Sequence, residues 1–196
     1  MNGDRFNDTI SENTPNRISC WAKINWPEAT RYVNRLQVRI VKATEAKKWN
    51  LVKRLQYLLT HSFYAKALAI KKVTQNKGKK TPGVDNQLWI TDKEKWDGIK
   101  ELQSQGYKAL PTKRVLIPKK NGKKRPLSIP TIKDRAMQTL YLFALQPVEE
   151  TIADEHSYGF RLNRSCQDAC EQAFAALSLK NSSHWILEGD IKVIAS

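Results

Sequence analysis

Residues 113–130 read KRVLIPKKNGKKRPLSIP, and this stretch carries the strongest local signal of fold in the chain. Two β-prone runs, at 113–118 and 125–130, flank the dipeptide Asn121-Gly122, which is favoured in tight hairpin turns. The sequence therefore predicts an antiparallel β-hairpin. Five basic residues crowd around its turn: Lys119, Lys120, Lys123, Lys124 and Arg125. Such a cluster suits a phosphate-bearing partner, but surface hairpins also carry lysines as solubilising groups, and the hairpin alone does not separate the two interpretations.

The residues before the hairpin predict three successive basic helices. Apolar residues recur at helical spacing over 26–48 (Val33, Leu36, Ile40), in a second stretch (Trp49, Val52, Leu55, Leu59), and from a Ser62 cap to a stop near Gly78. Basic residues lie along the first helix at a spacing of three or four: Arg31, Arg35, Arg39 and Lys42. Two more, Lys79 and Lys80, lie in the loop at 77–85. Basic stripes are usually solvated faces, but these helices carry almost no acidic residue. The pattern favours contact with RNA or DNA.

Three further helices and one strand are expected. Two sequences match a capping box at a helix start: Thr91 with Glu94, and Ser165 with Asp168. The first of these helices is expected to close at Gly106. Thr131 opens a long helix that Pro147 is expected to interrupt, because proline lacks the backbone N–H. Residues 185–191 (WILEGDI) predict a buried strand.

Charge separates the chain into a basic front and an acidic end. The 196 residues carry 34 Lys and Arg against 19 Asp and Glu, a net charge of +15. That charge is +12 over 1–80, +7 over 81–135 and −4 over 136–196. A strongly basic surface favours a polyanionic partner, since each phosphate neutralised by Lys or Arg releases a condensed counterion. The 40% hydrophobic content excludes a wholly disordered chain, although residues 1–20 are polar and predict a loose leader.

The cysteines and the hydropathy indicate in which cellular compartment the protein is expected. Cys20, Cys166 and Cys170 form no paired framework, which favours a reducing cytoplasm. Cys166 and Cys170 lie four apart without partners at zinc spacing, so both are predicted to be small core residues. No run approaches the ~18 apolar residues of a membrane span, and no membrane partner is expected.

Five blocks in order resemble those of reverse transcriptases, and most closely the reverse transcriptase/maturase proteins encoded by bacterial group II introns. The blocks are TPGVD (81–85), IPKKNGKKRPLSIP (117–130), KDRAMQ (133–138), SYGFRLNRS (157–165) and WILEGDIK (185–192). This resemblance implies an α+β fold, the fingers part of a right-hand polymerase with a basic helical amino-terminal extension, a β-hairpin and an incomplete palm. The implied division is a flexible leader at 1–20, the extension at 21–85, and fingers plus first palm strand at 86–196.

The resemblance also implies roles for particular residues. Lys119 and Arg125 match positions that grip the triphosphate of an incoming deoxynucleotide, and Arg161 and Arg164 match the template path. The basic helices, with Arg31, Arg35, Arg39, Lys42, Lys79 and Lys80, would hold the RNA of the intron. Asp190 matches the first of the carboxylates that clamp two Mg²⁺ ions in the complete enzyme. Target DNA and deoxynucleotides would be partners of the full-length parent.

The resemblance stops after Lys192. The family continues into Phe-Asp, whereas residues 193–196 read Val-Ile-Ala-Ser, and the later Tyr-Ala-Asp-Asp is absent. Leu162 also replaces the usual proline of its block. One carboxylate does not hold two Mg²⁺ ions, so we expect a truncated protein that retains RNA binding and has lost polymerase chemistry. The alternatives are a stand-alone RNA-binding splicing helper, or an inactive remnant of a disrupted gene.

Overall fold

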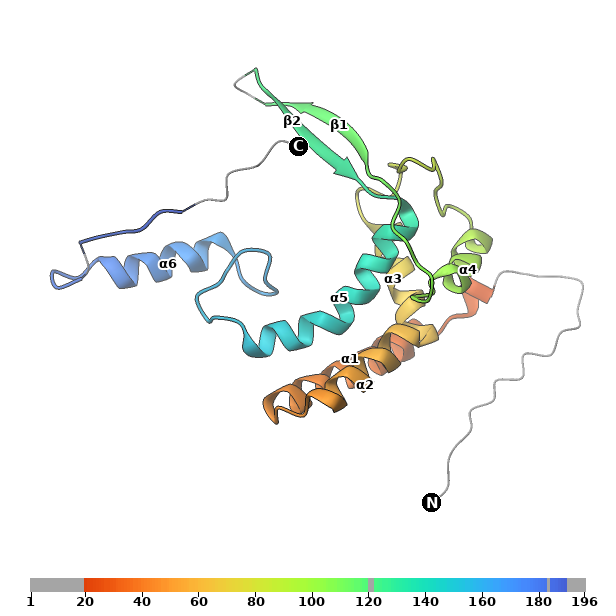
Figure 1. Ribbon diagram of the computed structural model, residues 1–196, viewed down its shortest axis with the longest axis horizontal. Coiled ribbons are helices and arrows are strands. Elements are labelled where there is room, and N and C mark those ends of the chain that lie inside the picture. Colours follow the sequence, from red (N-terminus) through yellow and green to blue (C-terminus); the bar gives the residue numbers. More distant parts are fainter. Residues whose placement is uncertain (1–19, 120–121, 183, 190–196) are drawn as a thin grey trace, which may run out of the picture. The chain divides into compact units, whose positions relative to one another are not determined.

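The computed structural model describes residues 20–119, 122–182 and 184–189 (Figure 1). The helices are η1 (Cys20–Lys23), α1 (Trp26–Glu45), α2 (Trp49–His61), α3 (Phe63–Gln75), α4 (Asp92–Glu101), α5 (Ile132–Ile152) and α6 (Cys166–Leu177); the strands are β1 (Lys113–Pro118) and β2 (Lys124–Ile129). Helices with one two-stranded antiparallel sheet confirm the α+β prediction at that level. The chain divides into two compact units, 1–148 and 149–196, and α5 runs across the division. None of the described helices is long and apolar enough to cross a membrane.

The predicted amino-terminal helices form the core of the first unit. The side chain of Asn25 accepts a hydrogen bond from the backbone N–H of Glu28 and thereby caps α1. Apolar residues at the predicted spacing are buried on α1, α2 and α3: Val33, Leu36, Ile40, Val52, Leu55, Leu59, Ala65, Ala69 and Ile70. Trp49 departs from the prediction, because it stands at the first position of α2 and is 47% exposed. The α1–α3 core thus leaves the basic faces of these helices in solvent.

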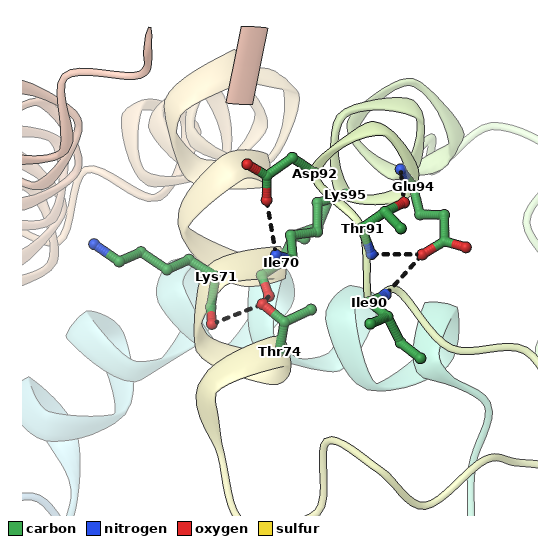
Figure 2. A network of polar contacts seen from close by, with 8 residues as sticks. All are labelled: Ile70, Lys71, Thr74, Ile90, Thr91, Asp92, Glu94 and Lys95. Carbon is green, nitrogen blue, oxygen red and sulfur yellow. Dashed lines mark hydrogen bonds and ion pairs between the residues drawn. The ribbon is translucent and has the colours of Figure 1, made fainter. Parts of the chain in front are cut away.

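Helix α4 begins at the predicted capping box (Figure 2). The side chain of Thr91 accepts from the backbone N–H of Glu94, and the Glu94 carboxylate accepts from the N–H groups of Thr91, at 2.7 Å, and Ile90, at 2.8 Å. These backbone hydrogen bonds lower the pKa of Glu94. The helix ends at Glu101 rather than at Gly106, which adopts a left-handed φ of +70° in the following loop.

The predicted hairpin is present, with a longer loop than two residues. Strands β1 and β2 pair antiparallel from Lys113 opposite Ile129 to Pro118 opposite Lys124. The N–H of Gly122 donates to the carbonyl of Lys119, and Gly122 has a φ of +76°. Gly122 therefore occupies the left-handed position that closes a three-residue hairpin loop, where glycine is favoured because it lacks Cβ.

Helix α5 passes through Pro147, contrary to the prediction that it would be interrupted there. Proline leaves the carbonyl four residues earlier, that of Phe143, without its helical donor. The side-chain amide of Gln37 donates to this carbonyl at 2.9 Å, and Gln56 donates to the carbonyl of Ala144 at 3.0 Å. Gln37 of α1 thus replaces the missing helical donor at the Phe143 carbonyl. Gln56 of α2 adds a hydrogen bond to the next carbonyl of the same turn.

The second unit has a formed helix but little burial. The predicted capping box of Ser165 and Asp168 starts α6, and none of the α6 residues is buried. Cys166 and Cys170 are exposed, so the prediction that they are core residues is wrong. The predicted strand at 185–191 is also absent over its described residues, 185–189, which form no regular secondary structure and are exposed. A strand needs a neighbour for its backbone hydrogen bonds, and the described residues of this unit provide none.

Candidate nucleic-acid interface

The basic stripe of α1 lies opposite the buried face of the helix. Arg31, Arg35, Arg39 and Lys42 are all exposed, and none makes an ion pair within the described part of the chain. They are spaced by four, four and three residues and so follow one face over about 16 Å of helix. The four cations therefore point to solvent without an internal counterion.

The loop that carries Lys79 and Lys80 is held by an arginine of α5. The Arg135 guanidinium donates to the carbonyl of Gly78 at 2.9 Å and to the carbonyl of Thr81 at 2.7 Å. These two bonds bracket Lys79 and Lys80, and both lysines are exposed. Burial lowers the pKa of Arg135, with a smaller opposing effect of a nearby carboxylate. Arg135 thus uses its hydrogen bonds on backbone oxygens and leaves the two lysines available.

A buried carboxylate supports the same end of α5. Asp134 is 4% exposed and accepts hydrogen bonds from the hydroxyls of Thr131, at 2.7 Å, and Tyr107. Its own backbone N–H donates to the Thr131 hydroxyl at 3.1 Å. A Cβ added to Gly83 of the TPGVD block would lie 2.6 Å from the Cα of Thr131, so only glycine fits there. The TPGVD and KDRAMQ blocks therefore pack against each other at the start of α5.

The hairpin brings Lys119 and Arg125 to one face. Residues opposite each other on paired strands share a face, and Arg125 is paired with Ile117. The backbone N–H of Lys119 donates to the carbonyl of Lys123 at 2.7 Å, which continues the pairing by one step. Because side chains alternate along a strand, Lys119 follows Ile117 onto the face of Arg125. Both basic residues are exposed.

The second unit keeps its two predicted template residues in internal contacts. Arg161 forms a two-pronged ion pair with Glu150, at 2.9 and 2.8 Å, and lies 3.4 Å from Glu149. The hydrogen bond from Arg161 lowers the pKa of Glu150, and the same bond raises that of Arg161. Arg164 donates to the carbonyls of Glu155 and Ser157. The Arg161 side chain is 5% exposed, so this conformation turns its charge inward.

Replacing Arg135 should loosen the loop that carries Lys79 and Lys80. In Arg135→Lys a single ammonium cannot reproduce the fork to both carbonyls, so we expect about 2 kcal/mol less protection of this loop against amide hydrogen exchange. Arg54→Lys is the matched control, because Arg54 is exposed and lies on α2, away from the loop at 76–81. Equal exchange at 76–81 in the two variants would contradict the role of Arg135.

Comparison with known proteins identifies the family. The model "N-terminal domain of reverse transcriptase" matches residues 21–102, and "Reverse transcriptase (RNA-dependent DNA polymerase)" matches residues 117–193. Protein YkfC of Escherichia coli is 37% identical over 147 residues, which cover 71% of this chain and 38% of that protein. The group II intron-encoded protein LtrA of Lactococcus lactis is 33% identical over 140 residues, which cover 70% of this chain and 22% of LtrA.

A third relative, the uncharacterized 91 kDa protein in the cob intron of Schizosaccharomyces pombe, is 37% identical over 94 residues, which cover 48% of this chain and 11% of that protein. The chain belongs to the group II intron reverse transcriptase/maturase family and corresponds to its amino-terminal part. It spans well under half the length of these relatives.

The metal site expected of a reverse transcriptase falls outside the described residues. Asp190, the predicted first carboxylate, is among the residues that the structure does not describe. The family generally uses Mg²⁺, but the described ranges contain no group of three or more His, Cys, Asp or Glu that could hold a metal ion. The assignment of Asp190 and of Mg²⁺ therefore stays a prediction.

Three residues at the start of α5 and before it were not singled out by the sequence pattern. Tyr107, Asp134 and Arg135 make the contacts that hold the TPGVD loop and the basic loop. Asp134 and Arg135 lie inside the KDRAMQ block, so the block order signalled their place but not their role. Tyr107 carried no signal, because its partner lies 27 residues away.

Proposed function

We propose that this chain binds structured group II intron RNA through its basic amino-terminal unit, as the RNA-anchoring part of a reverse transcriptase/maturase. Proteins of this family generally bind intron RNA. One observation carries the proposal: the four basic residues of α1 are exposed and make no ion pair within the described part of the chain. Arginine side chains presented in a row fit the phosphates of a folded RNA, because each can bind two phosphate oxygens.

The two parts of the chain that the resemblance defines would have different functions. Residues 21–85 would be the RNA-binding extension, after a leader at 1–20, and residues 86–196 the fingers with the start of the palm of a right-hand polymerase. Lys79 and Lys80 would add phosphate contacts beside α1. In the longer parent, Lys119 and Arg125 would bind the triphosphate of a deoxynucleotide, and Arg161 and Arg164 would lie along the template leading to target DNA. The shared face of Lys119 and Arg125 supports the triphosphate role.

Polymerase chemistry is not expected of a polypeptide with these 196 residues. Joining nucleotides requires two divalent metals held by several carboxylates, and Asp190 is the single residue matched to that set. With Mg²⁺ bound in a complete site, the metal would stabilise the charge that develops on the transferred phosphate. Within this chain, Lys119 and Arg125 would contribute binding and orientation of the phosphates alone.

A stand-alone RNA-binding module is the second candidate. The first unit has a continuous hydrophobic core drawn from α1 to α5, whereas the described residues of α6 and of 185–189 are not buried. A packed basic unit could bind RNA without the second unit. A stand-alone RNA-binding module would bind RNA specifically, whereas an inactive remnant would not.

RNA binding measured as a function of salt tests the proposal. We expect the purified chain to bind folded group II intron RNA with an affinity that falls steeply between 50 and 200 mM salt, as several phosphate contacts require. We expect no template-directed DNA synthesis with Mg²⁺ and deoxynucleotides. Absence of RNA binding at 50 mM salt would favour the remnant, and detectable synthesis would overturn the loss of polymerase chemistry.

A further inference from the structure

We propose that helix α2 is a stacking platform for unpaired nucleobases, distinct from the phosphate-binding stripe of α1. This inference rests on the proposed RNA binding and names the part of the RNA that α2 would take. Trp49, Lys53, Tyr57 and His61 follow one another at a spacing of four residues and are all exposed, so they form one face of α2. This face therefore presents two aromatic rings, an imidazole and a cation to solvent.

Tyr57 is held ready for stacking. Its ring lies against the His61 ring, with centroids 3.8 Å apart and planes 24° from parallel. His61 is itself fixed, because one ring nitrogen lies 2.9 Å from the carbonyl oxygen of Tyr57 and the other 3.2 Å from the hydroxyl of Ser104. Tyr57 is nevertheless 62% exposed, so the face of its ring away from His61 is open to a base. A ring already ordered loses little conformational freedom when a ligand stacks on it.

The charge around α2 selects a nucleic acid over a protein as the occupant. Between Glu45 and Asp85 the chain contains ten basic residues and no acidic one. Lys53 and Arg54 stand beside the aromatic residues on α2, and both are exposed. Exposed aromatic rings among cations bind single strands, because bases stack on the rings while the backbone follows the positive charge.

The spacing along α2 suits several nucleotides. Trp49 and Tyr57 are eight residues apart, which is about 12 Å along the helix axis. A stacked strand rises about 3.4 Å for each nucleotide, so the two rings are separated by roughly three to four bases. The exposed Leu51 and Leu58 beside them would otherwise fit a protein surface, which is the competing occupant. A fully paired RNA helix offers no free base faces to the rings, and α2 would therefore discriminate unpaired from paired RNA.

Substitution of Tyr57 tests this inference with two RNA probes of equal phosphate number. One is a single-stranded oligo(A) and the other a blunt, fully paired RNA duplex, both titrated into the full chain at one salt concentration. Tyr57→Ala should weaken oligo(A) binding by about 5- to 100-fold and leave binding of the RNA duplex within about twofold. Tyr57→Phe keeps the ring and should bind both probes as the wild type does. Lys53→Gln with Arg54→Gln should weaken both probes, since it removes charge without touching the rings.

The possible outcomes separate the inference from the proposed function. If the wild type binds the RNA duplex with salt dependence but Tyr57→Ala affects both probes equally or neither, the stacking platform is wrong and RNA binding stands. If the wild type binds neither probe nor intron RNA, both proposals fail. If Tyr57→Ala leaves oligo(A) binding intact and instead abolishes self-association in sedimentation, α2 is a protein surface and the inference is overturned. Tyr57 is exposed, so the variant is expected to fold, and its circular dichroism confirms that before titration.

Discussion

Replacing the four basic residues of α1 together with glutamine should lower the affinity for intron RNA by roughly 10²- to 10³-fold at 0.15 M salt. Arg31, Arg35, Arg39 and Lys42 are exposed and make no ion pair within the described residues, so each is free to replace a counterion on a phosphate. Each lost phosphate contact also lowers the slope of log affinity against log salt by about one. We therefore expect this negative slope to become shallower by about three to four, measured by titration at several salt concentrations.

A charge-matched control separates this effect from a general loss of positive charge. Four exposed lysines outside α1 provide it when changed to glutamine: Lys93, Lys100, Lys108 and Lys180. The control should weaken binding only slightly, because none of these residues lies on the α1 stripe. Equal losses in affinity and slope for the two variants would mean that net charge, rather than the α1 face, drives binding. Because all eight residues are exposed, both variants should keep the unfolding temperature of the wild type.

Asp134→Ala should have the largest effect of a single substitution on stability. The change removes a buried acceptor and leaves the hydroxyls of Tyr107 and Thr131 without their shared partner. Loss of two buried hydrogen bonds with their partners left in place costs about 3 kcal/mol. For a chain of this size that corresponds to a fall in Tm of about 6–12 °C, measured by thermal unfolding.

Tyr107→Phe is the matched variant, because it removes one of the two hydroxyl donors and keeps the ring. It should cost about 1 kcal/mol, well below Asp134→Ala. Burial, and then the hydrogen bond to Asp134, raise the pKa of the Tyr107 hydroxyl above its ordinary value. The folded state therefore favours the protonated phenol, and this stabilisation is complete below about pH 10 and is lost as the pH rises through the folded pKa. A Tm for Asp134→Ala equal to that of the wild type would contradict the role of the network.

The local elements of the fold were predictable because their signals are local. Capping boxes at Thr91 and Ser165 mark helix starts within three residues, and apolar spacing in α1 names the residues that the core buries. The hairpin was predictable for the same reason, although Gly122 closes a longer loop than the two-residue turn that the dipeptide favours. The basic residues of the candidate interface followed from spacing and charge alone.

Contacts between distant segments were not predictable from the sequence. The helix through Pro147 depends on the side chain of Gln37, 106 residues before the carbonyl it binds. Arg135 reaches a loop more than 50 residues earlier, so its role does not show in its own neighbourhood. The cysteines of α6 were misassigned because helical spacing tells which residues share a face, but not whether another element covers that face.

The hydrogen bonds from the two glutamines to α5 also constrain the order in which the fold forms during translation. Gln37 and Gln56 bind carbonyls that lie 106 and 88 residues later in the chain. A ribosome adding about 5–20 residues each second needs roughly 4–20 s to make that interval. Helices α1 to α3 pack mainly on one another and can form within it, with their basic faces already presented. The nascent chain would thus expose its proposed RNA-binding surface while α5 is still being translated. RNA that this surface binds would then have access to the protein before the polypeptide is released.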